Sequence, residues 1–176
     1  MSGACPSGLA FWHAIAGLAV AFALGACAGD RAHLLHVSIP DQRLTLFEHG
    51  LAKESYPVST SKFGTGDIPG SNCTPLGRMA VAQKIGAGEP PGMKFKDRRP
   101  TGEIVPVNAP GRDPIVTRIL WLRGLENQNA RAFERMIYIH GTPEEWRIGS
   151  PASYGCIRMR STDVIRLFNS VGEGAR

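Results

Sequence analysis

Two residue types that perform nucleophilic chemistry together, a histidine and a cysteine, stand sixteen residues apart as His140 and Cys156. A thiolate nucleophile needs a proton acceptor within hydrogen-bond reach, and imidazole is the usual one. The cysteine lies in the run Ser-Tyr-Gly-Cys-Ile-Arg at residues 153–158. Gly155 permits a tight turn whose amide N–H groups point at a substrate carbonyl. The spacing therefore suggests covalent acyl transfer through a thiol.

The same residues also allow non-catalytic interpretations. A single histidine and a single cysteine are more often structural than catalytic, and cysteine is among the most buried residue types. A structural zinc site needs about four ligands, and no CxxC or HxxxH cluster accompanies the pair. Cys73 offers a further alternative, because a Cys73–Cys156 disulfide would form in an oxidising compartment. Against these, Arg158 raises the local positive potential, which favours a thiolate and suits a carboxylate ligand.

The elements that must position this pair are mostly strands. Alternation and β-forming residues predict strands at 33–39, 42–48, 53–60, 78–85, 93–95, 103–105, 115–122 and 136–140. In the last of these, Ile137 and Ile139 face one way while Tyr138 and His140 face the other. If the core takes the isoleucines, His140 need not lie in apolar packing.

One helix is expected after the cysteine, with Ser161 or Thr162 as its cap and Gly172 as its stop. Its apolar face has helical spacing and consists of Val164, Leu167, Phe168 and Val171. We therefore expect a mainly β fold, a mixed sandwich or barrel with one C-terminal helix. The Gly/Pro-rich stretch 86–114 is either a lid or binding wall, or a plain surface loop.

Composition indicates one ordinary globular domain with an appendage. The chain has 176 residues, of which 43% are hydrophobic and 20% charged, and this argues against disorder. The 21 glycines and 13 prolines indicate many turns. Only 7% of the residues are aromatic and there is no Lys/Arg run, so a nucleic-acid partner is not expected.

The appendage is an apolar leader. No charged residue precedes Asp30, so the formal charge of +5 belongs to residues 30–176. The twenty residues 9–28 have the length of a bilayer-spanning helix or of a long signal-peptide core. The domain boundaries expected are therefore 1–29 for a leader or membrane anchor and 30–176 for the body.

The end of the leader, Leu24-Gly25-Ala26-Cys27, resembles the bacterial lipobox. This resemblance implies lipid attachment at Cys27. An uncleaved membrane anchor and a plain signal peptide cut near Ala28 are the alternatives. All three export the body, and alanine after the cysteine resembles the outer-membrane sorting pattern of Gram-negative lipoproteins.

The order His-Gly-Thr at 140–142, a spacer and then Ser-x-Gly-Cys-Ile-Arg-Met at 153–159 resembles the signature of YkuD-type L,D-transpeptidases. Segments 59–66 and 74–78 look like the substrate-side loops of that family. The resemblance covers approximately residues 33–170. It implies a mixed β-sandwich, peptidoglycan stem peptides as partners, and a site without cofactor or metal.

The resemblance also implies a reaction. Cys156 matches a nucleophile that attacks the third-position diaminopimelyl carbonyl of a donor tetrapeptide and expels the terminal D-alanine. An acceptor amine then takes the thioester, giving a 3-3 cross-link or wall attachment. His140 matches the base, and the backbone carbonyl of Gly141 orients the imidazole.

The remaining site residues come from the turn around the cysteine. The amides of Gly155 and Cys156, with Tyr154 as a further donor, match the oxyanion hole, and Ser153 belongs to the same substrate-binding turn. Arg158 matches the arginine near the donor site. Tyr154 stands where the family usually has histidine, and a tyrosine hydroxyl is a poor base at neutral pH. It either shapes the pocket or marks an altered or weakened enzyme.

Two alternative functions remain open at this stage. Water in place of the amine would make the protein a thiol L,D-carboxypeptidase or amidase of stem peptides. A decayed scaffold, suggested by Tyr154 alone, would be a non-catalytic wall-binding lipoprotein. We expect a monomer in the periplasm of a Gram-negative bacterium, held at a membrane by its leader or lipid.

Overall fold

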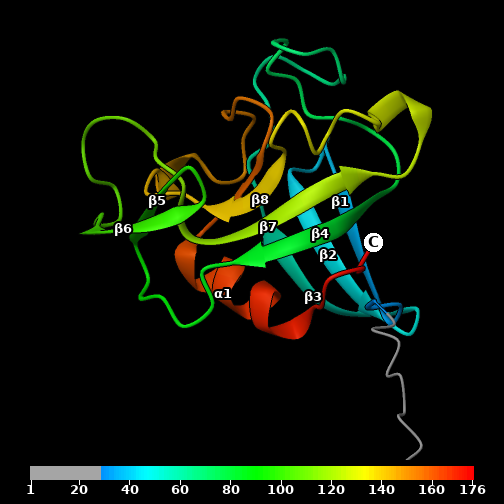
Figure 1. Ribbon diagram of the computed structural model, residues 1–176, viewed down its shortest axis with the longest axis horizontal. Coiled ribbons are helices and arrows are strands. Elements are labelled where there is room, and N and C mark those ends of the chain that lie inside the picture. Colours follow the sequence, from blue (N-terminus) through cyan, green and yellow to red (C-terminus); the bar gives the residue numbers. More distant parts are fainter. Residues whose placement is uncertain (1–28) are drawn as a thin grey trace, which may run out of the picture.

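A computed structural model describes residues 29–176, which form two β-sheets and one helix (Figure 1). The smaller sheet is an antiparallel meander of β1 (His33–Ser38), β2 (Arg43–Glu48) and β3 (Leu51–Pro57). The strands of the larger sheet are β4 (Met79–Ile85), β5 (Met93–Lys96), β6 (Arg99–Ile104), β7 (Val116–Gly124), β8 (Tyr138–Gly141) and β9 (Ile157–Met159). Their order is β6-β5-β7-β8-β9, with β4 also paired to β7.

The mainly β fold with one C-terminal helix confirms the sequence prediction, and seven of the nine strands lie close to their expected positions. Strand β6 begins at Arg99, four residues before the predicted strand 103–105. Strand β8 begins at Tyr138 rather than at Met136, because Met136 has a φ of 56°, which lies in the left-handed region and interrupts regular extended backbone. The ninth strand, β9, was missed. Three residues carry no alternation signal, and only parallel pairing with β8 makes them a strand.

The main core lies between the two sheets and the helix. Its buried side chains include Ile137 and Ile139 from one face of the β8 segment. Tyr138 points to the opposite face of β8, where it joins a second cluster with Met93, Phe95 and Ile119. The expected division of faces is therefore confirmed, although His140, on the Tyr138 face, is only 4% exposed. The outer face of β8 is a covered surface and not an open one.

Helix α1 (Ser161–Ser170) packs against β7 and β8 and lies beneath them in Figure 1. The predicted apolar face is confirmed, since Val164, Leu167, Phe168 and Val171 are all buried. The predicted cap is wrong. The N-cap residue is Arg160, which makes no side-chain cap bond, and the Ser161 N–H instead donates to the Glu145 carboxylate at 2.8 Å. A carboxylate from elsewhere in the chain thus replaces a local cap.

The segment 86–114 is not a plain loop. It contains the β5–β6 hairpin, and β5 continues the sheet by pairing with β7 at Lys94 and Val116. The leader, including Cys27, lies outside the described residues except for Gly29. Among residues 29–176, no helix has the length and apolar content required to cross a bilayer.

Candidate active site

The turn before β9 presents Cys156. The Ser153 hydroxyl donates to the Cys156 carbonyl at 2.6 Å and accepts the Gly155 N–H at 3.2 Å, which closes the turn. Gly155 has a φ of 118°, and a Cβ there would lie 3.2 Å from the Cys73 carbonyl oxygen. Only glycine fits this position without strain. In this closed turn the Gly155 amide is engaged with Ser153.

Two distant loops hold the same turn in place. The Ser153 N–H donates to the Thr60 carbonyl at 2.9 Å, and the Thr74 hydroxyl donates to the Gly155 carbonyl at 3.0 Å. The Ser61 N–H donates to that Thr74 hydroxyl at 3.0 Å and links the two loops. Segments 59–66 and 74–78, singled out in the sequence, therefore both adjoin the cysteine turn.

Strand pairing places Cys156 and His140 on one face of the sheet. Strands β8 and β9 are parallel, with Ile139 beside Ile157 and His140 beside Arg158. One step back along the register, the Tyr138 N–H lies 3.4 Å from the Cys156 sulfur. The register thus places the cysteine diagonally across from the histidine, two positions along the neighbouring strand.

The thiol is only partly exposed. Its Sγ–H donates to the Met136 carbonyl at 3.5 Å, and the side chain packs against the cluster that contains Tyr138. Burial raises the pKa of Cys156 to about 11, while the bond from the Tyr138 N–H acts in the opposite direction. At neutral pH the Cys156 side chain is therefore a thiol and not a stored thiolate.

His140 is held in one tautomer. Its Nδ1 lies 2.8 Å from the Gly141 carbonyl oxygen. Because a carbonyl only accepts, Nδ1 carries the proton and Nε2 keeps the free lone pair. Burial lowers the pKa of His140, so the imidazole is neutral at pH 7. A neutral base with an oriented Nε2 suits proton transfer that accompanies nucleophilic attack.

Arg158 lies behind the pair and is 2% exposed. It forms ion pairs with Asp113 and with Glu144, the latter at 3.0 Å, and donates to the Ser59 hydroxyl at 3.1 Å. The expectation that Arg158 offers its charge to a substrate carboxylate has little support in this arrangement, because two carboxylates of the chain already neutralise it. Its contacts instead tie the end of segment 86–114 to the loop after β8.

Asp113 is the site residue that sequence reasoning missed. It pairs with Arg158 and accepts the Thr142 hydroxyl at 2.5 Å, and its charge acts on the pKa of both His140 and Cys156. A lone aspartate before a proline in a Gly/Pro-rich stretch carries no local signal. Only a search for an acidic partner to Arg158 would have singled it out.

Replacing Arg158 with methionine is expected to lower the free energy of unfolding by about 3–5 kcal/mol, because it leaves two partly buried carboxylates without their cation. Urea unfolding measures the change. Arg78→Met is the matched control. Arg78 also pairs with a carboxylate, that of Glu126, but is 73% exposed at its side chain, so a loss below about 1 kcal/mol is expected. Equal losses in the two variants would contradict a structural role for Arg158.

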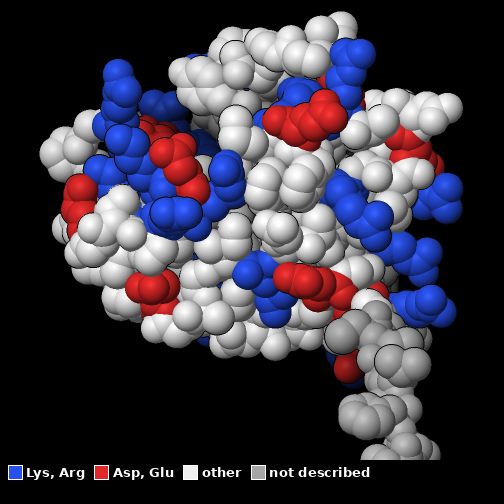
Figure 2. Space-filling view, viewed as in Figure 1, with Lys and Arg blue, Asp and Glu red and all other residues white. Residues whose placement is uncertain are grey.

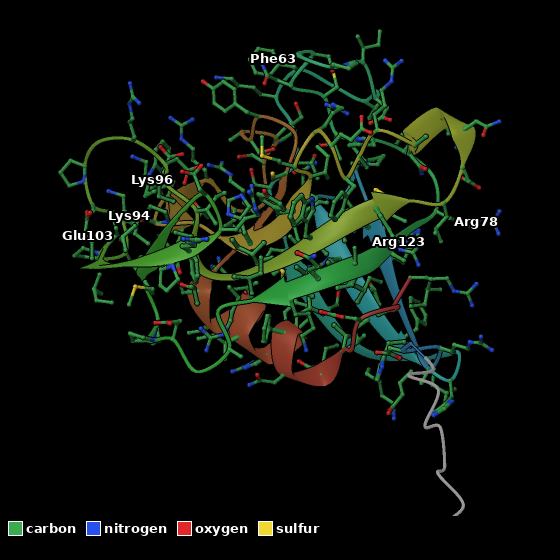
Figure 3. The ribbon with its side chains drawn as sticks, in the orientation of Figure 1. Phe63, Arg78, Lys94, Lys96, Glu103 and Arg123 are labelled. Atoms are coloured by element: carbon green, nitrogen blue, oxygen red, sulfur yellow. The ribbon has the colours of Figure 1, made fainter. Side chains whose placement is uncertain are left out.

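Tyr154 stands away from the thiol, on the surface. It is 62% exposed, its hydroxyl accepts the Lys62 ammonium at 3.0 Å, and its ring centroid lies 5.4 Å from that of Phe63. Figure 3 shows Phe63 at the outer end of the neighbouring loop. Tyr154 is thus a surface residue whose ring and hydroxyl contact the loop that carries Lys62 and Phe63.

The two described cysteines are both free. The Cys73 thiol is oriented to the Phe63 carbonyl at 3.2 Å, whereas the Cys156 thiol is oriented to the Met136 carbonyl. The two thiols thus bond to different groups and form no bridge with each other. Within residues 29–176, no group of three histidine, cysteine or acidic side chains is placed to hold a metal ion.

The structure thus combines a fold of two β-sheets with a histidine and a cysteine on neighbouring segments of the larger sheet. The family model described as the L,D-transpeptidase catalytic domain, YkuD, matches residues 32–176, and the chain belongs to this family. No protein of the curated set matches it in sequence.

Solved structures with the same fold are L,D-transpeptidases. They include L,D-transpeptidase 3 from Mycobacterium tuberculosis with a faropenem-derived adduct, at 18% identity and a TM-score of 0.54, covering 82% of this chain and 58% of that one. The enzyme from Mycobacterium smegmatis has 18% identity, a TM-score of 0.51 and coverage of 82% and 56%. A C442S mutant from Enterococcus faecium has 14% identity, a TM-score of 0.51 and coverage of 83% and 48%. The chain thus spans about half the length of these relatives.

Proposed function

We propose that the protein is a cysteine-dependent L,D-transpeptidase that acts on peptidoglycan stem peptides. The observation that carries the proposal is the single tautomer of His140, whose Nδ1–H is bound by the Gly141 carbonyl on the strand beside Cys156. A free Nε2 on the face that presents the thiol is what a thiol nucleophile requires. Family membership supplies the substrate class.

In the first half-reaction, the Cys156 proton passes to Nε2 of His140 as the sulfur attacks the third-position diaminopimelyl carbonyl. The oxyanion is received by the amides of Cys156 and Tyr154, and by that of Gly155 once its bond to Ser153 yields. The imidazolium then protonates the departing amine. D-alanine leaves and a thioester remains.

In the second half-reaction, an acceptor amine gives its proton to Nε2 and attacks the thioester carbonyl, and the thiol is restored. Water would waste the activated acyl group, so the site must exclude it. The second cluster supports this exclusion, because Met93 and Phe95 of strand β5 pack with Tyr138 beside the thiol. We therefore assign segment 86–114 as a wall of the donor site.

The apolar leader indicates where in the cell the protein would act. An apolar segment before residue 30 and a lipobox-like Cys27 support export and lipid attachment. We propose that the body works as a monomer in the periplasm of a Gram-negative bacterium, anchored to a membrane, where stem peptides are found.

Incubation with a disaccharide-tetrapeptide, followed by mass analysis, tests the reaction. A transpeptidase is expected to release D-alanine and to form a cross-linked dimer in equal amounts. Tripeptide without dimer would show that water is the acceptor and that the protein is a hydrolase. An unchanged substrate, with no adduct on the protein, would contradict both activities.

Replacing Tyr154 with histidine is expected to leave transpeptidation equal or higher, because the tyrosine is exposed and His140 already serves as the base. Rates with the tetrapeptide measure this. Tyr154→Phe is the matched control, which removes only the hydroxyl that accepts from Lys62. A large loss in the histidine variant alone would mean that the tyrosine ring has a dedicated role at this site.

A further inference from the structure

The turn between β5 and β6 carries a cation that the proposed mechanism does not use, Arg98. The basic side chains of this hairpin are Lys94, Lys96, Arg98 and Arg99. Lys and Arg gather over the β5–β6 side of the molecule in Figure 2, and Figure 3 labels two of them on the hairpin. Among these four, Arg98 differs in pointing back toward the large sheet.

The contacts of Arg98 show this direction. Its guanidinium lies 4.9 Å from the ring centroid of Trp121, and its Nη1 lies 3.5 Å from both the Tyr138 hydroxyl and the Met136 sulfur. Both polar contacts are long and their acceptors are uncharged. The ion pairs formed within residues 29–176 do not include Arg98, whereas Lys94 on the same hairpin pairs with Glu103 at 2.7 Å. Arg98 is thus a half-buried, un-neutralised cation with most of its donors free.

The backbone conformation of the turn that carries Arg98 is unfavourable for residues with a side chain. Asp97 and Arg98 both have left-handed φ values, 50° and 65°. A two-residue hairpin turn of this kind favours Asn-Gly, because a Cβ atom makes the left-handed region unfavourable for most other residues. The chain nevertheless keeps a long cationic side chain at the second position, where it faces the outer surface of β8.

That surface also holds the nucleophile. The Cys156 sulfur contacts the backbone of the same two residues, Met136 and Tyr138, whose side chains contact Arg98. The cation contacts the far end of the Tyr138 side chain and the thiol contacts the Tyr138 backbone, so both adjoin the same residue on this side of the sheet. In a peptide, the carboxylate of the last residue lies about 3–4 Å beyond the carbonyl carbon that precedes it. A scissile carbonyl at Cys156 would direct that carboxylate into this space.

We propose that Arg98 binds the terminal carboxylate of the donor peptide, an assignment that rests on the proposed function. A planar guanidinium binds a carboxylate through two parallel hydrogen bonds. Because only a C-terminal residue carries a carboxylate immediately after the scissile bond, Arg98 would select donors with one residue to be released. The substrate carboxylate thus goes to the hairpin arginine and not to Arg158, whose charge is already neutralised.

The test compares two donors, the disaccharide-tetrapeptide ending in D-alanine and the same compound ending in D-alaninamide. Release of the terminal residue is followed for the wild-type protein and for Arg98→Gln. The wild type is expected to prefer the free carboxylate by about 10–100-fold in kcat/KM. In the glutamine variant this ratio is expected to fall to about 1–3, through a higher KM for the carboxylate donor only.

Three further variants serve as controls for the proposed role of Arg98. Arg98→Lys is expected to retain part of the preference, and Arg98→Gly, which relieves the left-handed backbone, should lose the preference while folding normally by circular dichroism. Arg99→Gln is the matched control, since Arg99 is the neighbouring exposed cation at the start of β6, and this variant should keep the wild-type preference. A wild type that uses both donors equally, or a glutamine variant that keeps the preference, would overturn the role of Arg98 and leave the proposed function standing. A wild type inactive on both donors would overturn both.

Discussion

Replacing Cys156 with alanine is expected to abolish both the release of D-alanine and the formation of any covalent adduct. The reason is chemical, because without the sulfur no group at this position can hold the acyl fragment. Intact-protein mass spectrometry measures the result with two acyl donors, the disaccharide-tetrapeptide and imipenem. Imipenem is chosen because one structure of the same fold is a complex of an L,D-transpeptidase with it.

The matched control is Cys73→Ala, which removes the other thiol of the described residues. The Cys73 sulfur makes only weak contacts with backbone carbonyls, so this variant is expected to acquire the adduct as the wild type does. An adduct that persists on Cys156→Ala and disappears from Cys73→Ala would show that Cys73, and not Cys156, is the nucleophile. A wild type without any adduct would favour a wall-binding protein that lacks catalysis.

Sequence periodicity was sufficient for the fold because most strands obey it. Alternation along β2 and the helical spacing from Val164 to Val171 reflect burial on one face, and the continuous apolar run of β7 reflects burial on both faces. Strand β9 and the cap of α1 depend on distant partners instead. Ile157–Met159 becomes a strand through β8, and Ser161 is capped by the Glu145 carboxylate.

The residues of the candidate site likewise fall into those that the sequence predicts and those that depend on distant contacts in the fold. His140 and Cys156 were singled out as candidates because their residue types and order match a family signature. The acidic side chain beside them was not predicted, because Asp113 reaches Arg158 across 45 positions of the chain. The same limit applies to Arg98, whose relation to Tyr138 depends on how the β5–β6 hairpin folds back over the sheet. The sequence shows that a basic side chain is present, but it does not show which carboxylate, if any, pairs with that side chain in the fold.

Replacing His140 with alanine is expected to reduce the rate of acylation by about 10²–10⁴-fold at pH 7, the usual contribution of a general base. The effect should be large here because the thiol does not ionise on its own. With the pKa of Cys156 raised to about 11 by burial, almost none of it is thiolate at neutral pH. The imipenem adduct, followed in time by mass spectrometry, gives the rate for both proteins. His36→Ala, at an ordinary position in β1, is the matched histidine control.

The pH dependence distinguishes a base from a residue that merely packs. His140 accepts a proton only when neutral, and burial holds its pKa below the ordinary value of 6.5. The wild-type rate should therefore stay level as the pH falls through 6.5 and should decline only below the lowered pKa. In His140→Ala this decline at low pH disappears. The rate of the variant should instead rise steadily with pH toward 11 as the thiolate forms unaided, so the difference in rate between the wild type and the variant becomes smaller. Parallel pH profiles, with a constant deficit, would mean that the imidazole supports the structure of the site and does not take the proton.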